Sequence, residues 1–321
     1  MSVTQGSTLY GGSVSQAAIY EISQGLGLVW GQHVRTEMNV DGKPRQLTRA
    51  SNSGNPITEN VRNPRDVDFA ATSDTVIDGR NLSVSELMVP QAFPVADFKD
   101  TFPKYQPTGL SIDLKSNPKI QKVVFDRLME AAKTQLNELH SVGDTALAAP
   151  NPLRFYNGYI TQMLTDVDAT EVGVATNITL ANVIDRVYEL RNSVHPRLIN
   201  SGSLKIFMSY ADYFLYDQAR GATQTQVPNT DVKARPGIEN ISGIPMQIVP
   251  VLGIPKNFMF ATIADTTSKS NLVQGVWMEQ DQEAVKMYKT TEGDQDYKLL
   301  MRMDIGVQYV TGLDIYYVQG I

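Results

Sequence analysis

Residues 118–141 read PKIQKVVFDRLMEAAKTQLNELHS, and this stretch has the clearest helical pattern in the chain. Apolar side chains recur every three or four residues, Ser116 or Asn117 can cap the first turn, and Pro118 suits the first helical position. Gly143 follows the last periodic residue and is expected to end the helix. The pattern predicts a helix of roughly 36 Å at about 1.5 Å per residue, far longer than an average helix.

The apolar stripe of this helix is unusually wide, because it covers more than half of the circumference and leaves only a narrow charged strip. A stripe of this width is expected to be covered on two sides. The residues that represent this face are Ile120, Val124, Leu128 and Ala131.

The segment before residue 35 has a different composition. Residues 1–34 carry one acidic or basic side chain, Glu21, and are rich in Gly, Ser, Gln and Thr. Such a segment has too little apolar surface to fold alone. We therefore predict an arm that lies on another surface.

Residues 35–100 change from basic to acidic along their length and contain few large aliphatic residues before Val76. Asp41-Gly42 and Asp78-Gly79 have the composition of turns. We predict an extended loop or hairpin that projects from the body, and a loop of this length usually contacts a partner. Its charged candidate contacts are Arg35, Lys43, Arg45, Arg49, Arg62, Arg65, Asp66, Asp68, Asp74 and Asp78.

Two partners suit the six basic residues of this loop: nucleic acid, or the acidic half of the same loop on a neighbouring copy. The chain has 28 Lys and Arg against 34 Asp and Glu, a net charge of −6, which disfavours phosphate binding as the main task. No aromatic residue lies between Gly31 and Asp68 to stack on bases. Pairing between copies is therefore the preferred interpretation.

The region after the long helix alternates helices and strands. A helix is predicted over residues 180–194 with Thr179 as its cap, and a strand over 204–208. Ser209, with Asp212 three residues later, is expected to cap an aromatic helix over 210–220 that Gly221 ends. We expect that helix to be buried, and residues 222–237 to form a surface loop.

The last third of the chain is rich in strand patterns, predicted over 244–251, 257–263, 273–278 and 315–318. Residues 284–290 and 297–310 flank Glu292-Gly293-Asp294 as a hairpin. In its second arm, apolar residues from Leu299 to Tyr309 alternate with polar ones, so one face is expected to be wet.

Composition argues against catalysis. There is no cysteine and there are only three histidines, so thiol chemistry, disulfides and cysteine-ligated zinc are excluded. His140 lies in the last turn of the long helix, where a positive charge would suit the helix dipole. We assign no catalytic, cofactor-binding or metal-binding residue and expect no cofactor.

Two weaker patterns are compatible with chemistry. Ser116 and Lys119 match Ser-x-x-Lys at a helix start, as in some acyl-transfer enzymes, but the companion motifs are absent and capping explains Ser116. Asp166, Asp168 and Glu171 have carboxylates suited to a hard cation without EF-hand spacing, and we interpret them as a solvated turn. Neither a signal peptide nor a run of 18 apolar residues occurs, so a protein made in the cytoplasm is expected.

The order of these elements resembles the major capsid proteins of tailed bacteriophages, whose Johnson fold is shared with herpesvirus capsids. The stretches that carry the likeness are LKIFMSYAD at 204–212, ISGIPMQIVP at 241–250 and RMDIGVQYV at 302–310. The resemblance implies an α+β fold with an N-terminal arm (1–34), an extended loop (35–100) and a peripheral domain (101–150) with its spine helix (118–141). An axial domain (151–275) and a return of the chain to a peripheral-domain hairpin (276–321) complete it.

The resemblance implies a subunit that assembles as hexamers and pentamers into an icosahedral shell around a DNA genome. It implies a virion capsid assembled in the host cytoplasm, no sequence-specific DNA binding, no membrane, and scaffolding, portal and decoration proteins as possible partners. Many relatives begin with a long charged scaffolding segment, whereas this sequence begins with the arm. A separate scaffold or a mature form is therefore expected.

Within this scheme we predict that the loop lies across a neighbouring subunit and that the arm overlies a spine helix. Three alternatives stay open: the shell of a bacterial nanocompartment, a tail or baseplate protein, and a hydrolase that uses Ser116 and Lys119.

Overall fold

A computed structural model describes residues 8–9, 30–38, 40, 44–54, 73–94, 118–224, 239–241, 244–277, 285–289 and 296–320. Its helices are η1 (Trp30–Gln32), α3 (Pro118–Val142), α4 (Tyr159–Thr165), α5 (Val183–Ser193), α6 (Pro196–Ile199), α7 (Tyr210–Gln224) and η3 (Gly312–Asp314). No helix in these residues has the length and apolar character needed to cross a membrane.

The strands of the described residues form two six-stranded sheets and a two-stranded ribbon. The first sheet contains β1 (Thr8–Leu9), β2 (Arg35–Met38), β5 (Ser85–Pro94), β11 (Leu272–Trp277), β12 (Val285–Lys289) and β13 (Asp296–Tyr309). The second contains β6 (Thr170–Glu171), β7 (Leu204–Ser209), β8 (Glu239–Ile241), β9 (Ile244–Val251), β10 (Phe258–Ile263) and β14 (Tyr316–Gln319). The ribbon consists of β3 (Arg45–Gly54) and β4 (Ser73–Leu82).

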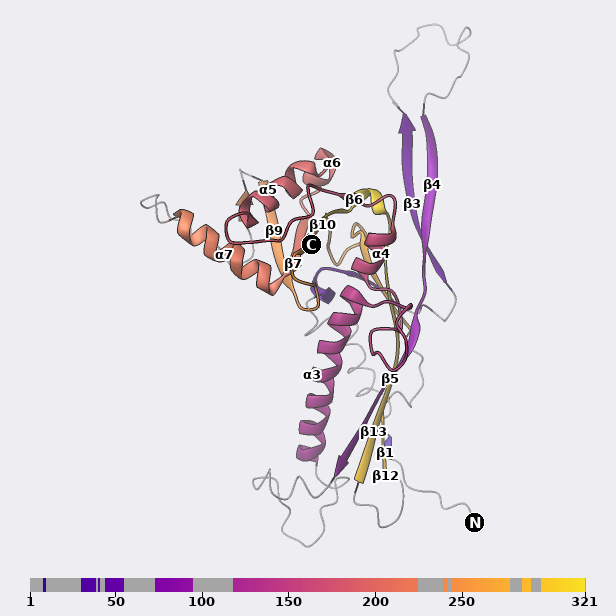
Figure 1. Cartoon of the computed structure of the whole chain (residues 1–321). Coiled ribbons are helices and arrows are strands. Elements are labelled where there is room, and N and C mark those ends of the chain that lie inside the picture. Colours follow the sequence, from indigo (N-terminus) through magenta and orange to yellow (C-terminus); the bar gives the residue numbers. More distant parts are fainter. Residues whose placement is uncertain are drawn as a thin grey trace, which may run out of the picture.

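The first sheet is organised around β13, which pairs with β5 along one edge and with β12 and then β11 along the other. Figure 1 shows β5 and β13 running beside the long helix α3. The side chains of Met303, Ile305, Val307 and Tyr309 are buried, whereas Arg302 on the opposite face is exposed. The predicted alternation is confirmed for the part of β13 whose side chains are described.

The second sheet is covered on both faces. Ile206, Met208 and Met259 pack against α5 and α7 on one side, while Phe207 and Phe260 belong to the core shared with α3 and α4 on the other. Strand β7 is buried on both faces, which explains its almost continuous run of apolar residues. The two sheets thus share one core, and α3 descends from it beside the first sheet (Figure 1).

Trp30 lies at the centre of the shared core and is fully buried. Its ring centroid is 5.2 Å from those of Tyr159 and Phe207, and its Nε1 donates a hydrogen bond to Ser141 Oγ at 3.1 Å. Ser141 Oγ in turn donates to the carbonyl of Asn137 one turn earlier in α3. The residues just before β2 are therefore anchored on the last turns of the long helix.

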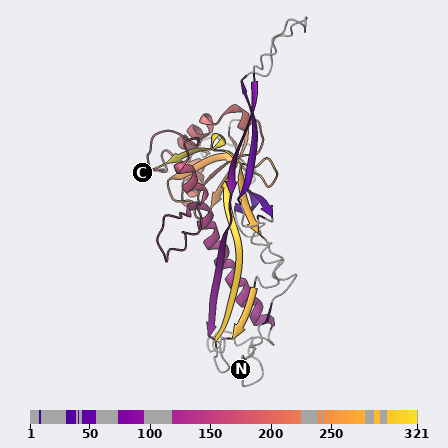
Figure 2. The same cartoon turned by 90° about the vertical axis from the view of Figure 1, so that its right-hand side faces the viewer.

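The ribbon projects from the body, as two views at right angles show (Figures 1 and 2). Its strands pair in register from Arg45 opposite Leu82 to Gly54 opposite Ser73. Ile77, on the ribbon, is 70% exposed. An isolated two-stranded hairpin is marginally stable at best, so the contacts that the ribbon makes matter for its stability.

Most predicted elements are present with shifted ends. The long helix runs one residue beyond the predicted end, the hairpin strands occur at 285–289 and 296–309, and Ser209 caps α7 as expected. The Asp212 amide donates to Ser209 Oγ at 3.0 Å, and Ser209 Oγ donates to the Asp212 carboxylate at 2.7 Å. The strand predicted at 315–318 is β14, which adds to the second sheet beside β10.

Several local expectations were wrong. Gly221 does not end α7, which continues to Gln224. Asp78-Gly79 is not a turn, because Gly79 lies within β4 opposite Thr48. The aromatic helix is only partly buried, since Phe214 is 65% exposed and only one side of α7 packs on the second sheet.

The expected boundaries of the long loop differ from the strands that are observed. Residues 35–38 form β2 in the first sheet and residues 85–94 form β5 alongside β13, so only residues 45–82 contain the projecting ribbon. The physical reason is that β2 and β5 each find a strand partner far away in the sequence, which local composition does not reveal.

Candidate functional site

The foot of the ribbon rests on two glycines of the first sheet. A Cβ on Gly306 would lie 1.9 Å from the carbonyl oxygen of Ser83, and one on Gly275 would lie 2.9 Å from the side chain of Leu82. Leu82 is fully buried, in a small cluster with Val40, Leu47 and Val273. We call residues 82–84, seated on these two glycines, the pivot of the ribbon.

The first polar contact beyond the pivot is centred on Asp166, just after α4. Arg80 Nη2 lies 2.6 Å from Asp166 Oδ2, and the Tyr309 hydroxyl donates to the same oxygen at 2.7 Å. The Arg80 guanidinium also stacks over the Tyr309 ring, 4.6 Å from its centroid. We call these three residues the Asp166 cluster, and it joins β4 to α4 and β13.

The Asp166 carboxylate is ionised within this cluster. Burial alone would raise its pKa, but hydrogen bonds from Tyr309 and Arg80 outweigh burial and lower the pKa below 3.8. Burial would likewise lower the pKa of Arg80, yet the hydrogen bond to Asp166 raises it. The Asp166 side chain is 7% exposed and has a structural partner, so the predicted solvated turn is wrong for Asp166, whereas Asp168 and Glu171 are exposed as predicted.

A second polar contact is centred on Asp314, in η3. Arg49 Nη1 donates to Thr311 Oγ1 at 2.9 Å, and Arg49 Nη2 lies 3.5 Å from Asp314 Oδ1. Arg197, from α6, approaches the same Asp314 oxygen at 2.8 Å. We call these four residues the Asp314 cluster. The Asp314 cluster joins β3 to the body, just as the Asp166 cluster joins β4 to the body.

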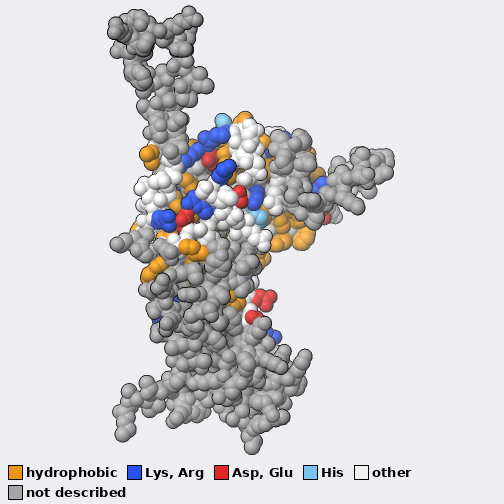
Figure 3. All heavy atoms as spheres, turned by 180° about the vertical axis from the view of Figure 1, so that it is seen from behind, with side chains coloured by type: hydrophobic (Ala, Val, Ile, Leu, Met, Phe, Trp, Pro, Cys, Tyr) orange, Lys and Arg blue, Asp and Glu red, His pale blue; other side chains and the backbone are white. Residues whose placement is uncertain are grey.

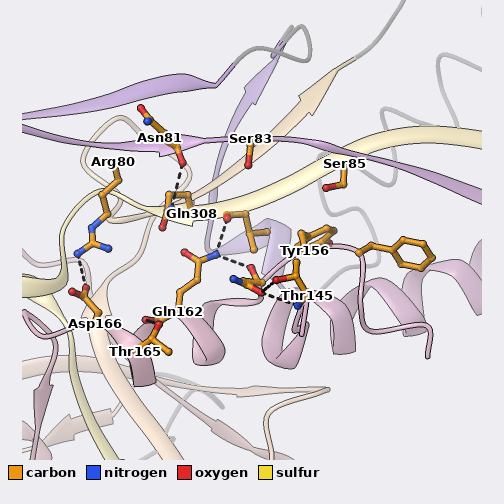
Figure 4. A pocket seen from close by; sticks show the side chains of 13 residues that line it. Arg80, Asn81, Ser83, Ser85, Thr145, Tyr156, Gln162, Thr165, Asp166 and Gln308 are labelled. Atoms are coloured by element: carbon orange, nitrogen blue, oxygen red, sulfur yellow. Dashed lines mark hydrogen bonds and ion pairs between the residues drawn. The ribbon is translucent and has the colours of Figure 1, made fainter. Parts of the chain in front are cut away.

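A polar cavity of about 400 Å³ lies under the ribbon foot. Figure 4 shows Arg80, Asn81 and Ser83 on the ribbon side and Thr145 and Gln162 on the body side. The Gln162 amide nitrogen donates to the carbonyls of Asn157 and Val307, which fixes the amide orientation. Most of the side chains between ribbon and body here are polar, with Phe155 and Val307 as apolar members of the lining.

The predicted loop residues lie in different settings. Arg35 and Arg45 both pair with Glu37 of the same chain, the second at 3.1 Å, and Arg49 belongs to the Asp314 cluster. Asp74 and Asp78 lie in β4, and their side chains are not described. Residues Lys43, Arg62, Arg65, Asp66 and Asp68 fall outside the described residues. Pairing of these charges between copies stays a prediction.

The predicted helix face is described in part. Leu128 is buried, while Ala131 is exposed because it faces the side of α3 that carries Arg127 and Glu138. Ile120 and Val124 belong to α3, but their side chains are not described. Coverage of this face by the arm stays a prediction.

The residues that sequence reasoning missed are Arg80, Asp314 and Gly306, on which the pivot rests, and the structural role of Asp166 was not predicted. The sequence offered one indication that Arg80 has a special role, because it is a lone arginine within an acid-rich stretch. Its partner lies 86 residues further along the chain, and no local pattern reports such a distance. The Asp314 pair of Arg49 spans 265 residues.

His140 does not carry the positive charge that its place in α3 suggested. It is fully buried, and its Nδ1 is hydrogen-bonded to the Tyr156 hydroxyl at 2.8 Å. Burial lowers the pKa of His140 to about 4, so the ring is neutral near pH 7. Desolvation therefore outweighs the helix dipole here.

Charged and hydrophobic side chains are distributed unevenly on the surface. Figure 3 shows Lys, Arg, Asp and Glu side chains close together on the body beside the ribbon. Large exposed hydrophobic residues include Ile77 on the ribbon and Met88, Phe155 and Phe214 elsewhere. Among the described residues, no group of three or more His, Cys, Asp or Glu could hold a metal ion.

Comparisons with known proteins show which solved structures share this architecture. No protein-family model matches the sequence, and no curated protein matches it either. A chain of the satellite phage P4 procapsid, in a structure that includes the size determination (Sid) protein, is 10% identical with a TM-score of 0.57. That match covers 95% of this chain and 99% of the other.

Two further structures give similar values. A chain of a virus-like particle from Pyrococcus furiosus is 11% identical, with a TM-score of 0.51 over 94% of this chain and 96% of that one. A capsid chain of an empty GTA particle is 12% identical, with a TM-score of 0.50 over 100% and 95%. The chain therefore has the phage capsid fold, the Johnson fold, and the fold predicted from the sequence is confirmed.

Proposed function

We propose that this protein is a major capsid protein that assembles as hexamers and pentamers into an icosahedral shell around the DNA of a tailed phage. The observation that carries the proposal is that the likeness to the P4 procapsid chain spans almost the whole of both chains. A fold shared over almost the whole of both chains is most simply used for the same kind of assembly.

The ribbon supports assembly on physical grounds. It projects from the body with Ile77 largely exposed, and two strands alone do not bury enough surface to be stable. A neighbouring subunit supplies the missing surface. Because each copy gives its ribbon to one neighbour and receives a ribbon from another, the contact is heterologous and closes into rings.

Several modest contacts per subunit are enough for a stable shell. A subunit held at its ribbon, its arm and its body gains affinity through multivalency, so no single interface has to be strong. Self-complementary charge in the loop would add register and selectivity to the ribbon contact.

The proposed setting is a virion capsid assembled in the host cytoplasm. Its proposed partners are further copies of the chain, a scaffolding protein, a portal and decoration proteins. The packaged DNA would be enclosed without sequence-specific binding, in keeping with the net charge of −6. The proposed role is structural and not enzymatic.

The first test is expression of the full chain, alone and with candidate scaffolding proteins, followed by electron microscopy. Closed icosahedral particles are expected. Tubes or open rings would overturn the shell assignment in favour of a tail or baseplate protein. Native particles that contain a cargo enzyme and no DNA would overturn the phage assignment in favour of a nanocompartment.

The second test removes the outer part of the ribbon. Ala50 and Ile77 face each other across β3 and β4, so residues 51–76 can be replaced by Asn-Gly, which suits a two-residue hairpin turn. Arg49 and Arg80 remain in place. The variant is expected to keep the far-ultraviolet circular dichroism of the parent and to form no closed shells. Normal shells of unchanged stability would refute the ribbon contact.

The third test concerns charge pairing between copies. Reversing two basic residues in Arg62→Glu/Arg65→Glu is expected to block assembly, because like charges would face each other. Adding Asp66→Lys/Asp68→Lys in the same chain restores opposite signs and should restore particles. Failure of this rescue, with both proteins folded, would contradict pairing between these two groups.

A further inference from the structure

We propose that the Asp166 and Asp314 clusters set the angle between the ribbon and the body, with residues 82–84 as the pivot, and that this angle selects the size of the shell. The link between the angle and shell size rests on the proposed function. The control of the angle by the two clusters concerns a single chain and is tested separately.

The pivot permits rotation because it is a small contact. Leu82 is anchored in a cluster of four buried residues, and the backbone of Ser83 crosses directly over Gly306. The cavity of about 400 Å³ beside it is lined mostly by polar side chains, so little apolar packing there resists tilting. The pivot thus fixes where the ribbon is attached but not its direction.

The direction is fixed further out, by one arginine on each strand. Arg80 lies two residues from Leu82, and Arg49 is opposite Asp78, four residues from Leu82. At about 3.3 Å per residue these contacts are roughly 7 and 13 Å from the pivot. They reach different parts of the body, Asp166 after α4 and Asp314 in η3, so together they restrain the tilt at two points.

The two clusters differ in how strongly each carboxylate binds the ribbon arginine. Asp166 accepts from Arg80 at 2.6 Å and from Tyr309 at 2.7 Å, and it is almost fully buried. Asp314 is shared between Arg49 at 3.5 Å and Arg197 at 2.8 Å, so Arg197 competes for the carboxylate from the body side. The Arg49 contact is therefore the one that yields first when a neighbour pulls on the ribbon.

A small tilt has a large effect at the ribbon end. Ser73 is nine residues from Leu82, about 30 Å along the strand, so a tilt of roughly 10° moves it by roughly 5 Å. A displacement of that size changes where the ribbon meets its neighbour. A narrow range of angles between ribbon and body then favours one curvature of the shell, and a wide range of angles allows several curvatures.

The angle can be measured on the unassembled subunit. Because the chain has no cysteine, Ile77→Cys on the ribbon and Phe214→Cys on the body, 70% and 65% exposed, accept spin labels at these two sites only. The distribution of distances between the labels is recorded by pulsed electron paramagnetic resonance. Arg49→Gln/Arg80→Gln is expected to at least double the width of this distribution relative to the parent.

The matched control is Arg186→Gln, which removes an arginine paired with Glu189 at 2.6 Å inside the body and leaves the ribbon foot untouched. It is expected to leave the distance distribution unchanged. An equal width in the parent and in Arg49→Gln/Arg80→Gln would overturn the proposal. Should that variant fail to fold, the nearly isosteric Asp166→Asn/Asp314→Asn is labelled and measured in its place. A broader distance distribution than the parent's would then support the proposal, and an equal width would overturn it.

Shell size is the second readout. Particles of Arg49→Gln/Arg80→Gln are expected to show at least two diameters where the parent shows one, while Arg186→Gln keeps the parent diameter. A single unchanged diameter with a broadened distance distribution would overturn the link to shell size. Absence of particles from the parent would refute the proposed function, and the label distances would still decide the role of the clusters.

Discussion

Replacing Trp30 tests whether the segment before β2 is a structural part of the core. The side chain is fully buried among Tyr159, Phe207 and Phe260, and its Nε1 donates to Ser141. Removing a buried tryptophan in Trp30→Ala typically costs about 3 to 5 kcal/mol. A domain is usually stable by about 5 to 15 kcal/mol, so this one change would remove a large share of the stability.

A graded series shows how much of the cost a smaller aromatic ring avoids. Trp30→Phe keeps an aromatic ring against Phe207 and Phe260 but loses the hydrogen bond to Ser141 and leaves a small cavity, so a cost of about 1 to 3 kcal/mol is expected. The smaller effect follows because Ser141 Oγ keeps its bond to the Asn137 carbonyl.

The assay is urea unfolding of the unassembled subunit, followed by far-ultraviolet circular dichroism. The control is Phe214→Ala, which truncates a side chain that is 65% exposed and should cost well under about 1 kcal/mol. If Trp30→Ala cost no more than Phe214→Ala, the anchoring of this segment in the core would be refuted.

Three further outcomes are expected from the same assay. Gly306→Ala places a Cβ 1.9 Å from the Ser83 carbonyl oxygen and should cost about 1 to 3 kcal/mol by displacing the ribbon foot. Ser209→Ala removes the cap of α7 and should cost about 1 to 2 kcal/mol. The unfolding free energy should fall as the pH drops from 6.5 to about 4, because the unfolded chain protonates His140 before the folded one does. The difference between these two pKa values corresponds to a loss of roughly 3 kcal/mol of unfolding free energy.

Each outcome has its own control. Gly221→Ala, where a Cβ has open space around it, should not destabilise the protein as Gly306→Ala does. Ser209→Thr keeps a hydroxyl and should retain most of the cap. His140→Gln should flatten the pH dependence, although His33, whose pKa burial also lowers to about 4, contributes a loss of the same sign. A pH profile that His140→Gln leaves unchanged would contradict the assignment.

The elements that the sequence predicted well are those whose pattern is local. The long helix shows its 3.6-residue period over many turns, and β13 alternates because one of its faces is buried and the other is wet. Ser209 and Asp212 are three residues apart, so their capping bonds depend on nothing distant.

The ribbon was predicted only as a projecting segment, for a physical reason. Its strands read RQLTRASNSG and SDTVIDGRNL, without a regular apolar alternation, because among the ribbon side chains that the structure describes only Leu47 and Leu82 are buried. Sequence alternation reports burial, and strands without a buried face lack it. Arg80 and Asp166 could not be paired in advance, since only the assembled fold brings them together.

The place of β13 and β14 in the chain has a consequence during synthesis. Strand β13 joins β5, β11 and β12, and β14 completes the second sheet beside β10, yet both follow residue 295. Neither sheet can close until these strands have left the ribosome, so β5 waits for its partner while some 200 residues are added. At about 5 to 20 residues per second that wait lasts roughly 10 to 40 seconds. Translation itself then sets the earliest moment at which either sheet can be complete.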